Sequence, residues 1–197
     1  MPRPQNYSEA EVVHQAMHLF WNQGYTNTGM SQLLSTTGLK PGSFYNRFES
    51  KKALFIRCLE QYNESVVGER VATHLCHGEP IGAIEGFFVS AFEPLSTDQL
   101  IGCLLTNTAT ELGNSDTEIS KTVWSGMQRI HKALSKLIQQ GQQEGAIDRA
   151  LDANNTALHL LSCFQGISVI GRLTRSKPKM RQLTQSALSV MQPGTIS

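Results

Sequence analysis

The sequence predicts an all-α fold of about nine helices, and three observations support this class. Apolar residues recur at spacings of three and four along most of the chain, as they do on the buried face of a helix. Residues that favour helix starts and ends, mainly Ser, Thr, Pro and Gly, separate these stretches. No stretch combines alternating apolar and polar residues with the turn chemistry of a hairpin, so little room is left for a sheet.

The first two helices are predicted from their end signals. Ser8 followed by Glu11 has the spacing of a capping box, and Gly24 ends the apolar pattern that begins after it. Thr28 is then expected to be the N-cap of a short second helix that ends at Gly38. The two helices are therefore joined by a short turn.

Two further helices follow almost at once. Pro41 is well suited to the first position of a third helix, because its missing N–H would have no partner there. Ser50 is expected to cap a fourth helix that runs from Lys51 towards Leu75. The remaining helices are predicted at about 80–93, 101–112, 115–145, 152–174 and 178–193.

Composition and charge are those of an ordinary globular protein. The chain has 197 residues, 40% of them hydrophobic, and a net charge of +1. Its longest apolar stretch is interrupted by polar residues and is too short to span a membrane, and no secretory signal is apparent at the N-terminus. We therefore expect a cytoplasmic protein without a membrane partner, whose four cysteines remain free thiols.

The charge is unevenly distributed along the chain. Residues 1–57 contain six Lys and Arg against three Glu, whereas the rest contains eleven basic residues against thirteen acidic ones. A mildly basic N-terminal region on a mildly acidic body is consistent with nucleic-acid contact through that region alone.

The segment 41–48 has an unusual exposed face for such a short helix. At 100° per residue, Phe44 and Phe48 share one side, while Gly42, Ser43 and Asn46 lie roughly opposite. Small residues allow close approach to DNA, hydroxyl groups contact phosphates, and an amide can pair with a base edge. Two short helices joined by a tight turn form a helix-turn-helix. The alternative is a helical hairpin that serves packing alone.

The stretch "GYTNTGMSQLLSTTGLKPGSFYNRFESKKALF", residues 24–55, resembles the DNA-binding region of the TetR family of bacterial repressors. The matching positions are Gly24-Tyr25, Thr28, Thr37-Gly38-Leu39, Gly42, Tyr45, Phe48 and Ser50-Lys51. Asn46-Arg47 departs from the family pattern, in which many members carry a His, so the role of Arg47 stays open.

The resemblance implies a dimer that binds a double-stranded DNA operator through residues 1–50, and a helical effector-binding and dimerisation domain over 51–197. Carried over position by position, the implied DNA-contacting residues are Thr28, Ser31, Lys40, Pro41, Gly42, Ser43, Tyr45, Asn46 and Lys51.

The predicted helix 152–174 carries more apolar residues than one internal face requires. The resemblance implies that this helix and the last one pair with those of a second copy. The alternative is that their apolar residues complete the core of one chain. The candidate interface residues are Leu160, Phe164, Ile167, Ile170, Gly171 and Leu188.

Two kinds of effector response are compatible with the sequence. The segment "IGCLLTNTATEL", residues 101–112, is similar to a subgroup of the family that includes repressors sensing electrophiles and oxidants through this cysteine. The resemblance would make Cys103 a sensor, and a buried structural cysteine is the alternative. The other response is a mainly apolar pocket for a small molecule. Its candidate lining residues are Phe87, Asn107, Trp124, Met127 and Phe164.

Two other function classes are less consistent with the residues. An all-α enzyme would need a converging set of catalytic groups, and only Glu111 and His131 offer themselves, without any spacing that requires them to meet. A helical protein-interaction module would explain the body but not the small polar face of segment 41–48. We predict no catalytic residue, cofactor or metal site.

Overall fold

The computed structural model describes residues 8–92 and 102–191, and every regular element within these ranges is helical. The all-α prediction is therefore confirmed. In chain order the elements are α1 (Glu9–Gln23), α2 (Met30–Thr37), α3 (Pro41–Phe48), α4 (Lys51–Tyr62), a π-helical segment (Asn63–Gly68), α5 (Glu69–His74), α6 (Pro80–Val89), α7 (Leu104–Leu112), α8 (Thr117–Glu144), α9 (Ala153–Thr174), α10 (Lys177–Leu188) and a final 3-10 turn (Ser189–Met191).

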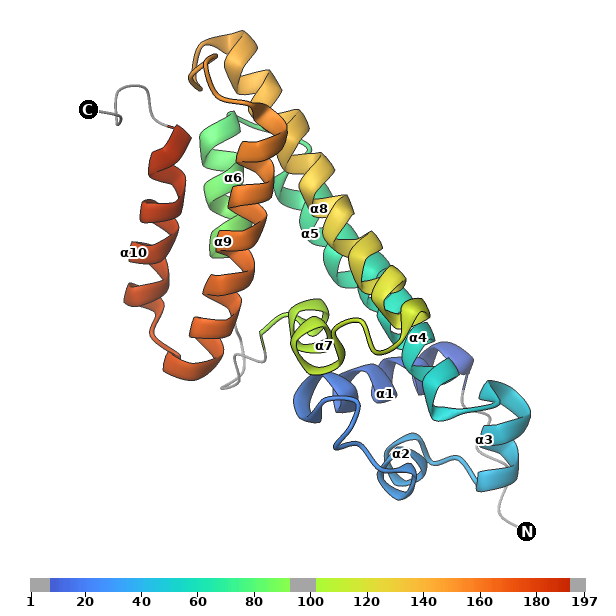
Figure 1. Cartoon of the computed structure of the whole chain (residues 1–197). Helices are drawn as coiled ribbons and strands as arrows, with labels where there is room; N and C mark the ends of the chain where they lie inside the picture. Colours follow the sequence, from blue (N-terminus) through green and yellow to red (C-terminus); the bar gives the residue numbers. More distant parts are fainter. Residues whose placement is uncertain (1–7, 93–101, 192–197) are drawn as a thin grey trace.

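Helices α1, α2 and α3 form a small unit at the end of the molecule opposite the connection between α8 and α9 (Figure 1). Their apolar side chains meet beneath α4, where the Phe20 and Phe55 rings pack edge to face with centroids 4.8 Å apart. The predicted capping box is present, because the Glu11 N–H donates to Ser8 Oγ and the Ser8 N–H donates to a Glu11 carboxylate oxygen. The capping signal in the sequence thus predicts the start of α1 correctly.

The prediction that Thr28 caps α2 is wrong. The N-cap is Gly29, whose N–H donates to the side-chain oxygen of Gln32. Thr28 is fully buried, and its hydroxyl donates to the Gly24 carbonyl oxygen at 2.6 Å. The Thr28 side chain thus lies within the α1–α2 turn, and the next residue, Gly29, takes the N-cap position of α2.

The helix predicted from Lys51 towards Leu75 forms a continuous rod, in which α4 and α5 are joined by the π-helical segment. Arg129 of α8 donates to the Asn63 carbonyl oxygen at 3.1 Å, and the Asn63 side chain donates to the Thr122 carbonyl oxygen at 3.0 Å. Wider helical turns disturb the regular ladder of hydrogen bonds. Here α8 supplies partners at the position where the ladder changes.

The body is built around α8 and α9, which pack along each other, while α10 covers α9 and α6 on the other side (Figure 1). The helix predicted at 101–112 begins at Leu104, with Cys103 as its N-cap, and the one predicted from Ser115 begins at Thr117, with Asp116 as its N-cap. The predicted ends at 93, 101 and 193 lie outside the described residues.

The close approach of α8 to the π-helical segment depends on Gly126. A Cβ at this position would overlap the Asn63 side-chain oxygen and would lie 2.7 Å from Leu105 Cδ1. We therefore expect Gly126→Ala to lower the free energy of unfolding by about 1–3 kcal/mol, which is typical of overpacking, in urea titrations followed by circular dichroism.

Gly42→Ala is the matched control, because no atom lies within 4 Å of a Cβ built there. It should leave stability unchanged or raise it by up to about 1 kcal/mol, since Ala favours helices more than Gly does. Equal stability of Gly126→Ala and wild type would contradict the tight contact between α8 and Asn63.

Candidate nucleic-acid interface

The turn between α2 and α3 depends on residues whose backbone conformations are restricted or unusual. Gly38 ends α2 in the left-handed conformation at φ 66°, which costs glycine little because it has no Cβ. Lys40 is the N-cap of α3, and Pro41 begins the helix as predicted. The chain therefore turns within three residues, and the N-terminus of α3 lies at the surface.

Helix α3 separates its residues into two faces, as the sequence predicts. Phe44 and Phe48 are buried, whereas Gly42, Ser43 and Asn46 are exposed. Tyr45 is 52% exposed, although its ring also packs edge to face on the Phe44 ring at 5.3 Å. A large aromatic side chain is thus packed on a buried ring while about half of its surface remains exposed.

Seven of the nine residues predicted to contact DNA are exposed. They are Ser31 on α2, Lys40 at the turn, and Pro41, Gly42, Ser43, Tyr45 and Asn46 on α3. Together they form an exposed surface of small, polar and basic residues, which we call the α3 face. Arg47 does not belong to it, because it lines a shallow groove with Glu9, Glu49 and Glu60.

The other two predicted residues are placed differently. Thr28 is buried inside the turn, so it has no surface to offer DNA. The Lys51 ammonium lies 4.3 Å from the centre of the Tyr25 ring, and partial burial lowers its pKa although Glu111 opposes this effect. Lys51 thus packs against the α1–α2 turn, a role that its position in the sequence does not reveal.

Glu111 of α7 holds the α1–α2 turn. Its two carboxylate oxygens accept hydrogen bonds from the backbone N–H groups of Tyr25, at 2.9 Å, and Thr26, at 2.6 Å. Gly24 is required beside it, because a Cβ at that position would lie 2.7 Å from Glu111 Oε2. A carboxylate that accepts two N–H groups makes stronger hydrogen bonds than a neutral acceptor.

The electrostatics of this contact favour the charged carboxylate. Burial by itself raises the pKa of Glu111, but the hydrogen bonds from Thr26 and Tyr25 and the nearby Lys51 ammonium outweigh it and lower the pKa below its ordinary value of 4.5. Glu111 is therefore ionised at neutral pH. Its role was missed from the sequence, because a contact across 85 residues leaves no local signal.

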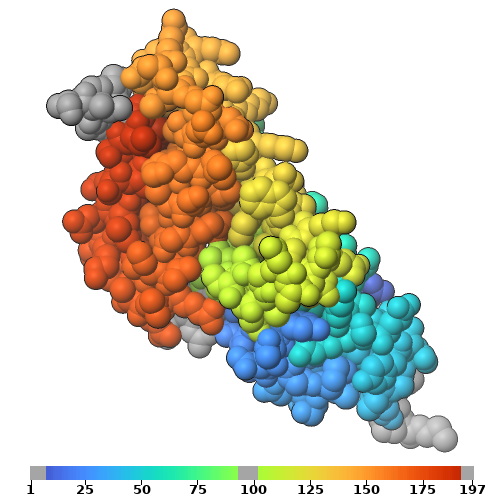
Figure 2. Space-filling view, viewed as in Figure 1, coloured from blue at the N-terminus to red at the C-terminus, as the bar shows by residue number. Residues whose placement is uncertain are grey.

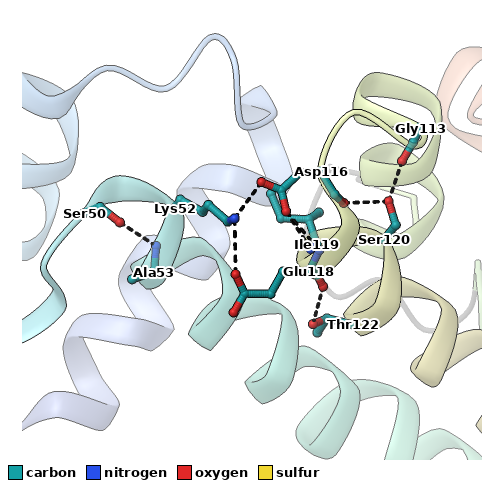
Figure 3. Close-up of polar contacts among 9 residues, drawn as sticks. All are labelled: Ser50, Lys52, Ala53, Gly113, Asp116, Glu118, Ile119, Ser120 and Thr122. Carbon is teal, nitrogen blue, oxygen red and sulfur yellow. Dashed lines mark hydrogen bonds and ion pairs between the residues drawn. The ribbon is translucent and has the colours of Figure 1, made fainter.

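A second contact joins α4 to the start of α8 (Figure 3). The Lys52 ammonium lies 2.7 Å from Asp116 and 3.2 Å from Glu118, and these hydrogen bonds raise the pKa of Lys52. Asp116 also caps α8, since its carboxylate accepts the N–H groups of Glu118 and Ile119. One carboxylate thus both begins α8 and contacts the helix that follows α3.

The C-terminal half of α1 is held by two further contacts with the body. The indole N–H of Trp21 donates to the Gly102 carbonyl oxygen at 3.0 Å, and Arg172 of α9 donates to the Asn22 carbonyl oxygen at 3.2 Å. We call the set formed by Trp21, Tyr25 and Thr26 with Gly102 and Glu111 the junction. It connects the three-helix unit to the body beside α7.

Within residues 8–92 and 102–191, the residues predicted to form an effector pocket lie in three different places. The Phe87 and Phe164 rings pack together in the core with centroids 4.6 Å apart, and Asn107 is directed towards the Trp21 carbonyl oxygen. Trp124 and Met127 instead line a surface groove between α7 and α8. The predicted set therefore contains core residues, surface residues and Asn107, which lies beside the junction.

Cys103 is 4% exposed, and the hydroxyl of the fully buried Tyr62 donates to its sulfur at 3.7 Å. Burial raises the pKa of Tyr62 well above its ordinary value, so this hydroxyl remains protonated and can donate. Since Gly102 is bonded to Trp21, the cysteine is directly next to the junction.

The residues predicted to form the dimer surface are mostly buried in the single chain. Ile170 is half-buried, but Leu160, Phe164, Ile167, Gly171 and Leu188 are buried within the single chain and have no surface for a partner. Their side chains complete the core, which is the alternative that the sequence left open. The apolar residues that are exposed on α9 are Leu158, Val169 and Leu173.

The remaining predicted groups do not converge. His131 of α8 is bonded to the Asn154 carbonyl oxygen, whereas Glu111 faces the α1–α2 turn. Within residues 8–92 and 102–191, no three His, Cys, Asp or Glu side chains gather closely enough to hold a metal ion. In the same ranges no helix combines the length and the apolar character that crossing a membrane requires.

Three short helices with an exposed, small and polar α3, attached to a larger helical body, define a helix-turn-helix DNA-binding regulator. Comparison with known proteins identifies the family. The family model described as "Bacterial regulatory proteins, tetR family" matches residues 12–58. The model described as "Tetracyclin repressor-like, C-terminal domain" matches residues 84–187. The chain therefore belongs to the TetR family, whose members are transcription regulators and not enzymes.

Individual relatives agree with this assignment. The chain is 27% identical to the HTH-type transcriptional repressor ComR of Escherichia coli (strain K12), over 94% of this chain and 90% of ComR. A TetR transcriptional regulator from Chloroflexus aurantiacus J-10-FL superposes with a TM-score of 0.79 at 27% identity, covering 91% of both chains. A cysteine mutant of the regulator CifR, in complex with 26-bp double-stranded operator DNA, has the same fold, with a TM-score of 0.84 at 17% identity over 97% of this chain and 100% of that one.

The contact of Glu111 with the α1–α2 turn predicts a pH-dependent contribution to stability. A carboxylate whose pKa is lowered by folding stabilises the fold above its ordinary pKa, and this contribution is lost as the pH falls below that value. We expect Glu111→Gln to lower the free energy of unfolding by about 1 kcal/mol at neutral pH, a modest amount because the side chain is largely exposed.

The difference between Glu111→Gln and wild type should shrink at about pH 4 and below, as measured by urea unfolding across the pH range. Glu85→Gln is the control, because Glu85 is an exposed carboxylate on α6, away from the turn. A pH-independent difference for Glu111→Gln would rule out the charged contact.

Proposed function

We propose that the protein is a dimeric transcriptional repressor that acts in the cytoplasm and binds a pseudo-palindromic operator. Binding of a small molecule, or modification of a thiol, would release it from DNA. The observation that carries this proposal is the α3 face, because its exposed small, polar and basic residues can approach DNA closely and donate hydrogen bonds to it. We also propose that residues 1–50 form the DNA-binding domain and residues 51–197 the effector-binding and dimerisation domain.

The chemistry of the α3 face supports contact with the DNA backbone and with base edges. Gly42 has open space around it, so the start of α3 can approach closely. Backbone N–H groups at this helix start, together with Ser43 and Tyr45, can donate to phosphate oxygens. Asn46 follows on the same exposed side, where its amide can pair with a base edge in the major groove.

The exposed surface of α9 supports a dimer. Leu158, Val169 and Leu173 follow one another along one side of the helix with Gly166 between them, and Leu173 is 80% exposed. A Cβ at Gly166 would meet no atom of the chain, so a second helix can approach closely there. A two-fold dimer would present its two α3 helices to successive major grooves, roughly 34 Å apart.

Release from DNA requires that an effector favour one arrangement of the two α3 helices over another. The junction supports such coupling, because the α1–α2 turn is bonded to α7 through Glu111. Cys103 is next in sequence to Gly102, which accepts the Trp21 indole hydrogen. A bulky or charged group on Cys103 would therefore disturb the junction, provided that the buried thiol first becomes accessible.

DNA binding by the α3 face can be tested with three variants. Tyr45→Ala should weaken binding to all duplexes by about tenfold, Tyr45→Phe should show the share due to the hydroxyl, and Asn46→Ala should change the preference among sequences. Fluorescence anisotropy with an operator selected from random duplexes, and with random DNA, measures both effects over a series of salt concentrations.

Wild-type affinity should fall steeply with salt, because phosphate contacts release counterions. Equal losses on selected and random DNA for Asn46→Ala would refute its base-reading role. An affinity that does not depend on salt would contradict DNA binding by the α3 face altogether.

The dimer can be tested by placing a charge on α9. Val169→Glu should weaken dimerisation by about 100-fold, since an unpaired carboxylate would be buried at the interface. Analytical ultracentrifugation checks the oligomeric state, and circular dichroism should show unchanged helix content, because Val169 is exposed in the single chain.

Gln128→Glu adds the same charge at an exposed position of α8 and serves as the control. It should remain dimeric. A Val169→Glu protein that dimerises as tightly as this control would place the interface elsewhere.

A further inference from the structure

A groove lies at the surface between α7 and the first turns of α8, and the proposed function does not yet explain it. It has a volume of about 610 Å3, and its apolar part consists of Ala109, Val123, Trp124 and Met127. Figure 2 shows these two segments in yellow-green and yellow on the face turned to the reader. We propose that this groove, the α7–α8 groove, is the effector site and that it binds a small planar aromatic anion. This inference rests on the proposed repressor function.

The apolar part of the groove is suited to an aromatic ring. Trp124 is 50% exposed, whereas Val123 beside it is buried and Met127 is half-buried. An exposed indole next to a thioether offers a flat, polarisable surface on which a ring can stack. The core phenylalanines offer no such surface, because Phe88 and Phe164 pack edge to face at 5.6 Å and both are fully buried.

The charge of the groove favours an anion. Among the described residues that line it, Lys121 is the only charged one, and within residues 8–92 and 102–191 it makes no ion pair. The acidic residue one turn before it, Glu118, lies 3.2 Å from Lys52 and is thus already paired. The Lys121 ammonium therefore remains available to a carboxylate, sulfonate or phosphate carried by the ligand.

The size of the groove favours a small molecule. A volume of about 610 Å3 lies within the range of about 300–1,000 Å3 typical of small-molecule sites. The polar residues of the lining, Asn114, Thr117 and Ser120, lie on the α7–α8 turn and the first turn of α8. A few polar groups around an apolar surface orient a ligand, as in other sites of this kind.

The position of the groove connects it to DNA binding. Ala109, in its lining, is two residues before Glu111, which holds the α1–α2 turn. Gly113 and Thr117, which also line the groove, lie on either side of Asp116 in the sequence. Asp116 contacts Lys52 of α4 (Figure 3). A ligand inserted between α7 and α8 would therefore act on α7, which contacts the α1–α2 turn, and on α8, which contacts the helix that follows α3.

A pair of fluorescent probes tests the proposed chemistry. The aromatic anion 1-anilinonaphthalene-8-sulfonate should bind one site per chain, with energy transfer from Trp124. Its neutral counterpart N-phenyl-1-naphthylamine has the same rings without the sulfonate and should bind at least about tenfold more weakly. Equal affinity for the two probes would refute the anion site.

Variants of the full-length protein locate the site. Lys121→Gln should weaken binding of the anionic probe about tenfold and leave the neutral probe unchanged, and Trp124→Ala should weaken binding of both. Lys136→Gln, an exposed lysine further along α8, is the matched control and should bind like wild type. Unaltered binding to Lys121→Gln and Trp124→Ala would place the probe elsewhere and overturn the proposal.

The regulatory half of the proposal is tested on DNA. Saturating anionic probe should weaken operator binding by at least about tenfold in wild type and in Lys136→Gln, but not in Lys121→Gln. Probe binding without any change in DNA affinity would refute the effector role. Probe binding that appears only when the dimer is diluted to monomers would show instead that a second copy covers the groove.

Failure of the proposed function is distinguishable from failure of this inference. If the protein without any probe binds no duplex even at low salt, the repressor assignment is wrong, whatever the probe titrations show. If DNA binding is intact and the probe titrations fail, only the α7–α8 groove is excluded as the effector site.

Discussion

The position of the α1–α2 turn relative to α7 depends on the contact between the Glu111 carboxylate and the backbone N–H groups of Tyr25 and Thr26. These two amides belong to the turn that separates α1 from α2, so the carboxylate determines where the helix-turn-helix lies relative to α7. Gly24 allows the close approach, and Lys51, stacked on the Tyr25 ring, contributes a positive charge beside it. One side chain of the body thereby positions the surface expected to contact DNA.

Further contacts converge on the same region from other helices. Asp116 begins α8 and binds Lys52, while Gly102, just before α7, accepts the Trp21 indole hydrogen. Helix α7 is thus held near its start by the Trp21 contact of Gly102 and near its end by the contact of Glu111 with the α1–α2 turn. It therefore cannot shift without moving the DNA-binding unit. This is a physical basis for coupling between the body and the α3 face, and it applies equally to a ligand in the α7–α8 groove and to a modified Cys103. The two routes differ in access, since the groove is open to solvent whereas the thiol is buried.

The sequence predicted those parts of the site that are encoded locally. The exposed side of α3 follows from the helical period and from Phe44 and Phe48, and the turn before it follows from Gly38 and Pro41. Thr28 was misassigned as an N-cap because a hydroxyl can donate as well as accept: here it donates to the Gly24 carbonyl oxygen within the α1–α2 turn and does not accept from the start of α2. Lys51 remains a predicted DNA contact, but its position at a helix start does not reveal that Tyr25 lies beside it.

The sequence by itself thus determined the all-α class, the order of the helices and the two faces of α3, because hydrophobic period and capping act over a few residues. Only the tertiary structure decided which side of α9 is exposed and which residues form the junction. Leu160 and Leu173 are equally apolar in the sequence, yet one is buried and the other is 80% exposed, because α8 and α10 cover only part of the helix surface. Glu111 could not be assigned either, since its partners lie 85 and 86 residues away and only the folded chain brings them together.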